Sequence, residues 1–434
     1  MSLWNRTKFA DEHIRGRCEK FLQASLSGKL AYGDFEHEIL RARVCDLELK
    51  VLRDARPQYP GPRPGQPDTF SGDVLQASLL CHLGHEGIAL KTLGEQATEQ
   101  GRKMRSVHIL DIIRASVQQR QGHAPLDRME LLQAGFSTLD VSDLLSNVAG
   151  KILTDAYNAY PSVARLVSRR LPSSDFKPHK AVRLGANASF EEVAGAGEIK
   201  HGSATDVARP FQVKTYAKMF VLSRTDLIDD DMGGFDQFPR LLAAGAAQTL
   251  ESTFWSLVMS NPSSFFNGSA GNFQSGVGSV LGVPGLTAAL TLLRRQVDEN
   301  GEPIAVQPRF LICPPELEVE ANTLYRSLTV NTGGAATDTR VPNANSFYGM
   351  LEPQVVPHLS NSNYANFSLT GWYTASAPSD PACAFGLSFL NGVETPIIET
   401  SQADFSVLGL QMRGVLDFGV ALLDPAGAVL SAGV

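Results

Sequence analysis

Apolar residues between Asp236 and Asn261 recur at the spacing of one helix face. The pattern predicts a long helix that acts as a spine for a sheet, and an ordinary core helix is the alternative. We expect Asp236 to be the N-cap, Pro239 to lie in the first turn and Pro262 to end the helix. The apolar stripe consists of Phe238, Leu242, Ala246, Leu250, Phe254 and Val258, widened by Leu241, Trp255 and Leu257.

The first 134 residues show helical spacing and no strand pattern. A helix is expected within 11–53, and two or three more within 71–120. Between them, the proline-rich stretch at 56–68 predicts a stiff, extended linker. The segment has no catalytic signature, so we interpret 1–134 as a helical, scaffold-like or docking module, and a simple helical adaptor is the alternative.

From Phe136 the pattern changes. An amphipathic helix is expected first, and the stretch at 176–222 then becomes strand-like, with two long arms and a glycine-rich tip. Apolar alternation in the second arm, from Phe211 to Val221, slips once. A hairpin of this length has few contacts of its own to bury it, so we expect it to lie on another molecule.

The chain after the spine predicts an α/β unit. Helices are expected at 286–298 and 315–327, with a strand between them at Arg309–Cys313. The segment that closes the chain, from Leu408 to Pro425, predicts a strand pair or one long bent strand. Further short strands are expected near Gln354–Val356, Gly371–Ala375, Ala384–Phe389 and Pro396–Glu399.

Composition narrows the function. The chain has 434 residues and a net charge of −7, and only 19% of its residues are charged. Residues 1–134 carry 19 basic against 17 acidic side chains, and the remainder carries 19 against 28. Neither part has the dense basic patch of a nucleic-acid-binding protein. The five scattered cysteines, with no signal peptide or long apolar span, are typical of reduced thiols in a cytosolic product.

Candidate chemistry is sparse. Cys81, His82 and His85 lie close together, but no second ligand cluster follows at zinc spacing. The acidic run at 229–231 lacks the pattern of an EF-hand, and dipole and capping effects at the helix start explain it better. Lys200, near the hairpin tip, is more simply a solvated lysine than a cross-linking residue. No P-loop, dinucleotide fingerprint or nucleophile elbow is present. We therefore expect no catalytic, cofactor-binding or metal-binding residues, no cofactor, and no enzyme.

Several segments, in this order, resemble the major capsid proteins of tailed phages with the Hong Kong 97-type fold, and most closely the Mu-like prophage major head subunit group. The likeness covers about 136–434. The segments are S-T-L-D-V-S-D-L-L-S-N-V-A-G-K-I-L, F-V-L-S-R-T-D-L-I-D-D-D-M-G-G-F, A-A-Q-T-L-E-S-T-F-W-S-L-V-M-S-N-P, P-R-F-L-I-C-P-P-E-L-E-V-E-A, F-L-N-G-V-E-T-P-I-I-E and M-R-G-V-L-D-F-G-V-A-L-L-D-P-A-G.

The resemblance implies an α+β capsid fold preceded by the helical module. The implied divisions are a module at 1–134, an N-terminal arm at 135–175, an extended hairpin loop at 176–222, a peripheral domain with the spine at 223–285, an axial domain at 286–395, and closing strands of the peripheral domain at 396–434.

The family also implies a function. Hexamers and pentamers of the subunit would close an icosahedral shell around a DNA genome, as a virion component assembled in the host cytoplasm and without a membrane. The implied partners are the portal, a prohead protease, head-completion proteins and, non-specifically, the packaged DNA. An encapsulin-like compartment shell is the alternative, and a hydrolase built on His358 is a weaker one, since no nucleophile motif accompanies it. We expect any cleavage to fall between Gln121 and Phe136, after which the helical module would leave.

Overall fold

The computed structural model describes residues 72–103, 139–186, 204–223, 232–298, 301–330, 343–402 and 409–434. The predicted helix at 11–53, the proline-rich linker, the acidic run at 229–231 and Lys200 lie outside these ranges. Contacts divide the chain into 1–71 and 72–434, and the description below concerns the second unit.

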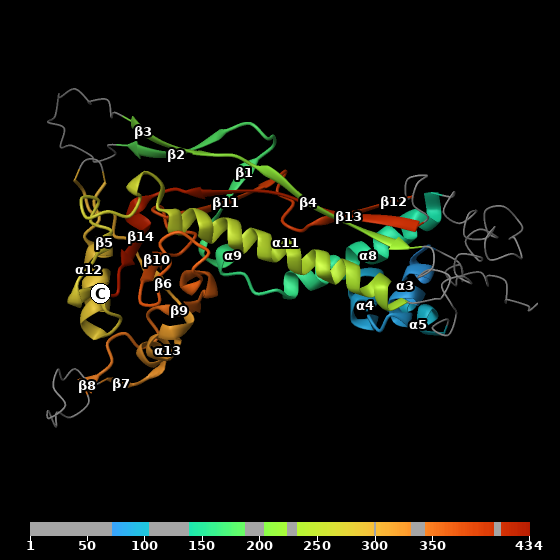
Figure 1. The fold of residues 1–434 in the computed structure, drawn as a ribbon, viewed down its shortest axis with the longest axis horizontal. Coiled ribbons are helices and arrows are strands. Elements are labelled where there is room, and N and C mark those ends of the chain that lie inside the picture. Colours follow the sequence, from blue (N-terminus) through green and yellow to red (C-terminus); the bar gives the residue numbers. More distant parts are fainter. Residues whose placement is uncertain are drawn as a thin grey trace, which may run out of the picture. The chain divides into compact units, whose positions relative to one another are not determined.

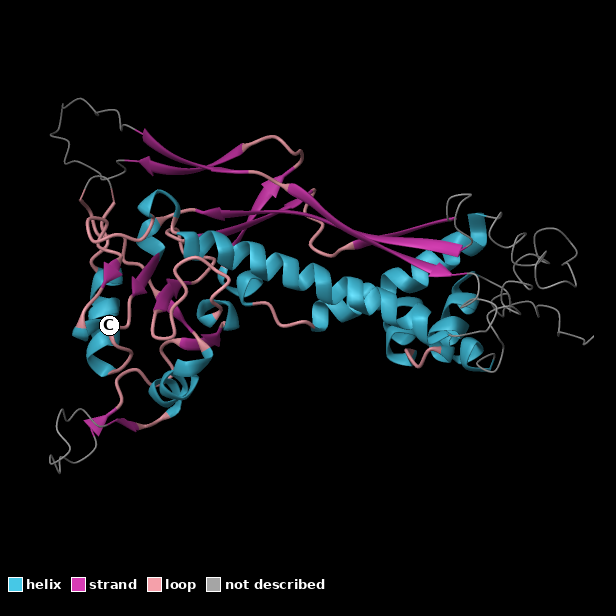
Figure 2. Ribbon diagram, viewed as in Figure 1, coloured by secondary structure: helices cyan, strands magenta, loops and turns pink. Residues whose placement is uncertain are grey.

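Helices and strands alternate irregularly along this unit (Figures 1 and 2). The helices are α3 (Gly72–His82), α4 (Glu86–Leu93), α5 (Glu95–Lys103), α8 (Leu139–Ala159), α9 (Val163–Val167), α11 (Met232–Ser260), α12 (Val283–Arg294) and α13 (Glu318–Arg326). The strands are β1 (Arg169–Ser173), β2 (His179–Ala186), β3 (Ala204–Phe211), β4 (Lys214–Ser223), β5 (Phe273–Gln274), β6 (Pro308–Cys313), β7 (Thr329–Val330), β8 (Asn343–Ala344), β9 (Glu352–Val355), β10 (Trp372–Ser376), β11 (Phe385–Leu390), β12 (Ile397–Gln402), β13 (Gly409–Leu422) and β14 (Ala428–Ser431).

Strand β13 is the centre of the first five-stranded sheet, whose order is β1-β11-β13-β12 with β4 also paired to β13. β13 has 14 residues, so the closing segment contains one long strand, as one of the two predicted alternatives has it. β12 pairs antiparallel with residues 410–415 of β13, and β4 pairs antiparallel with residues 409–418. Since one strand has only two edges, β12 and β4 lie on opposite sides of β13.

The spine helix α11 packs on this sheet and on α8 and α9. Phe254 meets Phe385 of β11 edge-on, with ring centroids 5.5 Å apart, and Phe238 stacks on Phe220 of β4 at 5.3 Å. Leu250 and Phe254 are 0% and 1% exposed. The predicted stripe is therefore the buried face, with one correction. Leu241 is 54% exposed, because it lies to the side of the contact with the sheet.

The predicted start of the spine is wrong. α11 begins at Met232, so Asp236 lies inside the helix and is no N-cap, and Pro239 follows the first turn. The carboxylate of Asp236 instead contacts His85, with Oδ1 2.6 Å from Nε2. The apolar spacing did not predict the first turn of α11, because the residues of that turn, Met232, Gly233 and Gly234, do not continue the apolar stripe. A contact 151 residues away determines the role of Asp236.

The buried carboxylate of Glu251 joins the spine to the start of α9. Its Oε1 accepts hydrogen bonds from the Ser162 hydroxyl at 2.5 Å and the Ala164 amide at 3.0 Å. Its Oε2 accepts one from the indole of Trp255 at 2.7 Å. These donors compensate for the loss of hydration, which makes a carboxylate tolerable at 6% exposure.

The hairpin is shorter than predicted. Its strands are β2 and β3, which pair antiparallel from His179↔Phe211 to Ala186↔Ala204. The following strand, β4, pairs with β13 and belongs to the first sheet. The slip in apolar alternation marks this break, because Gln212 and Val213 form the link where the chain changes sheets.

The second five-stranded sheet has the order β5-β14-β10-β6-β9. Leu286, Leu290 and Leu293 of α12 lie in the buried cluster that covers it. Trp372 of β10 is buried there, and its indole donates to the Ser279 carbonyl at 2.9 Å. Two predicted assignments fail. β11 was expected in the axial domain, but it pairs within the first sheet. β14 was expected among the closing strands of the peripheral domain, but it pairs within the second sheet. Backbone pairing, and not order along the chain, decides to which sheet a strand belongs.

Helices α3–α5 pack with the elements that follow residue 138 and do not form a unit of their own. Val74, Leu79 and Leu80 of α3 are 0% exposed and share one buried cluster with residues of α8 and α11. The contact boundary therefore falls after Ser71, not near residue 134. A functional division near residue 134 stays a prediction.

Leu250→Asp or Phe254→Asp should unfold the subunit. Each places an unpaired carboxylate in the buried stripe, at a cost of several kcal/mol, comparable with the stability of a domain. Leu241→Asp on the same helix is the matched control, and its exposed position predicts a change within about 0.5 kcal/mol. Thermal melts and limited proteolysis of the three purified variants measure this. A melting temperature for Leu250→Asp equal to that of the control would show that the stripe faces solvent.

Candidate assembly surfaces

Side chains singled out as candidate metal ligands are used for packing and pairing. Cys81 is buried in α3, and His85 faces Asp236 of the spine. Within the described ranges, no group of three or more His, Cys, Asp or Glu residues could hold a metal ion. Cys313 and Cys383 are also buried, and burial raises the pKa of the Cys313 thiol to about 12. At neutral pH that thiol is protonated and a poor nucleophile.

His358 lies in an aromatic contact. Its ring meets the ring of Tyr364 edge-on, with centroids 5.4 Å apart. Burial lowers the pKa of His358, and the negative charge of Glu251 partly opposes this. Both carboxylate oxygens of Glu251 already accept hydrogen bonds, Oε1 from Ser162 and Ala164 and Oε2 from Trp255. The arrangement supports packing rather than the hydrolase alternative.

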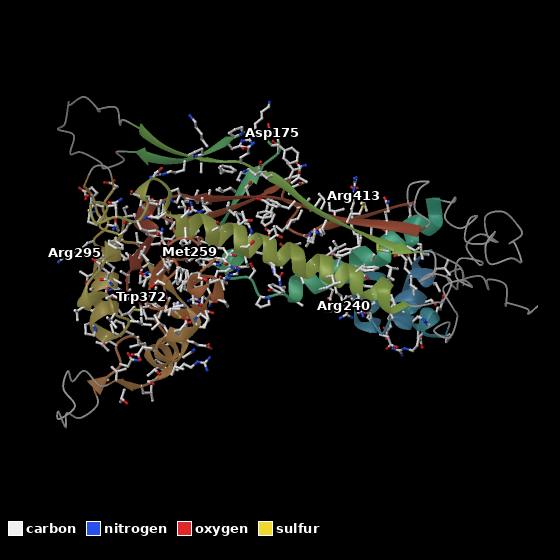
Figure 3. All side chains as sticks on the ribbon, viewed as in Figure 1. Asp175, Arg240, Met259, Arg295, Trp372 and Arg413 are labelled. Carbon is white, nitrogen blue, oxygen red and sulfur yellow. The ribbon has the colours of Figure 1, made fainter. Side chains whose placement is uncertain are left out.

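Several side-chain contacts hold the base of the hairpin, where Figure 3 labels Asp175. Asp175 Oδ1 lies 2.7 Å from Nε2 of His179, the first residue of β2. The amide of Lys177 donates to the same oxygen, and this bond is the main reason that the pKa of Asp175 is lowered. His179 also stacks on Phe211, the last residue of β3, with centroids 5.6 Å apart. These contacts fix the angle at which both strands leave the sheet.

The link after the hairpin, Gln212 and Val213, packs closely against the backbone of β13 at Gly419. A Cβ on Gly419 would lie 2.4 Å from the carbonyl oxygen of Gln212 and 3.2 Å from the Cα of Val213. Only glycine leaves room for this crossing of two backbones. Val213 itself is 1% exposed. The hairpin is therefore held at both its base and its exit.

An apolar groove of about 560 Å³ runs between the spine and the first sheet. Tyr216 and Phe220 of β4 form one wall, and Leu241 and Gly245 of α11 form the other. Its remaining lining residues include Ala246, Pro396, Gly414, Val415 and Leu416. Among the described residues that line it, Lys218 alone is charged. The groove is a low-charge surface without converging polar groups, which favours contact with apolar side chains over small-molecule chemistry.

Single apolar side chains project from the second sheet's layer. Val319 of α13 is 79% exposed and Leu328, before β7, is 71% exposed. Val277, in the turn before α12, is 93% exposed. Trp372, labelled in Figure 3, lies in the buried cluster of the same layer. Scattered exposed apolar residues are common on monomers, but these add to a groove and a projecting hairpin.

No helix in the described ranges is both long and apolar enough to cross a membrane. The groove, the hairpin and the exposed apolar side chains are surfaces suited to contact with apolar groups of another protein. They contain none of the converging polar groups of a catalytic site.

Family comparison agrees with this architecture. Residues 206–431, just over half of the chain, match the family described as phage capsid protein. The chain therefore belongs to the phage capsid protein family and is a capsid shell protein. The α+β fold of the Hong Kong 97 type predicted from the sequence is confirmed by this match together with the observed spine, hairpin and sheets.

Comparison with solved structures also found similar chains. A chain of Mycobacterium phage Ogopogo is 13% identical, with a TM-score of 0.37, and the match covers 62% of this chain and 91% of that one. The procapsid of bacteriophage JBD30 is 14% identical, with a TM-score of 0.33 and coverage of 68% and 76%. The holo-SrpI encapsulin complex from Synechococcus elongatus PCC 7942 is 9% identical, with a TM-score of 0.41 and coverage of 62% and 85%. No curated protein matches the chain.

The sequence analysis missed two features of the structure described above. The first is the pairing of β4 with β13, for which the alternation slip between Val213 and Tyr216 was the available signal. The second is the carboxylate of Glu251, which stands between Leu250 and Phe254 on an otherwise apolar stripe. A charged residue in that position, one turn before a tryptophan, signals a buried polar network.

Gly419→Ala should destabilise the link between the hairpin and the sheet. Its methyl group would overlap the Gln212 carbonyl, and relief of that overlap costs about 1–3 kcal/mol. Gly245→Ala on the spine is the control, since a Cβ there meets nothing within 4 Å. Removal of a helical glycine should stabilise by about 0.5–1 kcal/mol. Denaturant unfolding measures both, and equal midpoints would contradict the close crossing.

Proposed function

We propose that this chain is the major capsid protein of a tailed bacteriophage or prophage and assembles with copies of itself into an icosahedral shell around the DNA genome. The match of residues 206–431 to the phage capsid protein family carries the proposal. It spans most of strand β3, the spine, the second sheet and all of the first sheet except β1, so it covers the link after the hairpin and the apolar groove.

Physical properties support a shell subunit. Only 19% of residues are charged, so large contact surfaces can form with little desolvation of charge. The hairpin is a projecting element that could lie on a neighbouring subunit, and the apolar groove is a hollow that could receive apolar side chains of one. The shell part, 135–434, carries a net charge of −9, from 19 basic and 28 acidic residues. A wall of this sign binds DNA weakly, which suits a genome that must be packed and later released.

Finer assignments belong to the same proposal. The segments quoted above favour the Mu-like prophage major head subunit group. A shell of this kind would contain hexamers and pentamers and would work with a portal, a prohead protease and head-completion proteins. As a virion component it would assemble in the host cytoplasm. The long segment before residue 135 favours a phage shell over an encapsulin-like compartment, which has less need of a scaffold.

Purified full-length protein should form closed shells that electron microscopy detects directly.

Deletion of 190–205, at the end of the hairpin, should leave a soluble, folded subunit that cannot close shells, because the hairpin is expected to lie on a neighbouring subunit. An unchanged melting temperature of the deletion variant is the control for folding. Normal shells from this variant would refute the role of the hairpin. Shells from phage-infected cells that hold an enzyme instead of DNA would favour the encapsulin-like alternative.

Mass spectrometry of the coat protein from mature particles tests processing of the chain. We expect a shell chain that begins between Gln121 and Phe136 and contains about 300 residues. The polar, proline-containing stretch at 119–135 and the change of charge across it motivate this prediction. Full-length chains in DNA-filled heads would show that no cleavage occurs there.

A further inference from the structure

Residues 72–103, named the helical cap, form a closely packed unit of three helices. α5 crosses α3 at the distance of backbone contact, because a Cβ on Gly101 would lie 2.6 Å from the amide nitrogen of Ser78. Thr98 beside this crossing is 1% exposed, and its hydroxyl donates to the Gly94 carbonyl at 2.7 Å. The cap therefore has a defined shape rather than being a run of separate helices.

The apolar side of the cap is continuous with the core of the shell part. The cap contacts α8 through both α3 and α4. Its buried residues belong to the same cluster as those of α8 and α11. On the cap these are Val74, Leu75, Ala77, Leu79, Leu80, Ile88, Ala89 and Ala97, and on α8 they include Leu144, Leu145, Val148, Ala149, Ile152 and Leu153.

Polar contacts at the edge of this interface fix its position. Asp236 Oδ1 lies 2.6 Å from His85 Nε2 and accepts a hydrogen bond from Arg240 Nε at 3.2 Å. The side chains of His85 and Asp236 are both partly buried, so dissolved salt weakens this contact less than it would weaken a fully exposed ion pair. On the other element, Lys151 of α8 donates to the side-chain oxygen of Gln76 in α3. Arg240 is labelled in Figure 3 on the half of the spine that faces the cap.

Separation of the cap would be costly on both sides. Helices of 8 to 11 residues are marginal in water without tertiary contacts, so a released cap would lose its structure. The part of the α8 surface that α3 and α4 contact would lose its cover. Burial also lowers the pKa of Lys151, while the charge of Asp73 opposes this, as expected for a partly buried ammonium group beside the cap.

We propose that the helical cap is a permanent part of the shell subunit, which stays seated on α8 and the spine after the chain is cut anywhere in 104–138. This revises the expectation that the whole helical module leaves. The occupant of the α8 surface is thus a segment of this same chain, held without a covalent link. The proposal does not depend on shell assembly, since every contact involved lies within one subunit.

An engineered cut tests the proposal. A site-specific protease sequence is inserted between Gln121 and Phe136 of the full chain, and the folded protein is cleaved. We expect the N-terminal fragment to elute with the shell fragment in equimolar amount on gel filtration, and the two to separate only in denaturant. Cut shells, where they form, should sediment with the fragment attached. An N-terminal fragment that elutes alone in native buffer overturns the proposal, whether or not shells form.

Matched variants locate the contact. Leu80→Asp, at a buried position of the cap, should release the fragment after cleavage, whereas Leu90→Asp, 44% exposed on α4, should not. Asp236→Asn should lower the denaturant concentration at which the fragment leaves, and it covers the case in which Leu80→Asp fails to fold. Arg102→Gln is its control, because Arg102 pairs with Glu86 inside the cap at 3.1 Å. Equal release by Asp236→Asn and Arg102→Gln would contradict an interface fixed at the spine.

Discussion

Burial of one face of the spine helix is the constraint on which the other elements depend. Leu250, Phe254 and Trp255 are at most 1% exposed, and the helix contacts the first sheet, α8 and α9. Its two ends lie at different parts of the subunit. Asp236 near the start meets the helical cap, and the carbonyl of Met259 near the end accepts a hydrogen bond from Asn366 at 2.8 Å. Strands and helices far apart in sequence are positioned by what they cover on this one helix.

A polar network inside that face adds specificity. Glu251 accepts from Ser162, Ala164 and Trp255, so the turn before α9 has one position relative to the spine. Apolar contacts alone tolerate small sliding of a helix, whereas a buried carboxylate with three donors does not. The same logic applies at the hairpin base, where Asp175, His179 and Phe211 set the direction of a projecting element. A shell subunit needs such fixed directions, because errors in angle accumulate over many copies.

The helical cap changes the picture of the segment that precedes the shell part. Sequence texture and charge divide the chain near residue 134, but the packing of Leu79 and Leu80 divides it after Ser71. Both divisions have a physical basis. A protease recognises an accessible stretch of chain, while stability depends on buried apolar contacts. A chain can therefore be cut at one place and remain associated across the cut.

The sequence by itself determined the elements and the fold class. The spacing of Leu242, Leu250 and Phe254 predicted the spine, and the motif order predicted the capsid fold, because local periodicity and segment order are written in the chain. Tertiary structure alone decided the partners. It moved β4 and β11 into the sheet around β13, exposed Leu241, and paired Asp236 with His85. The pairing of β4 with β13 and the contact between Asp236 and His85 join residues more than 150 positions apart. No local pattern encodes which distant group completes such a contact.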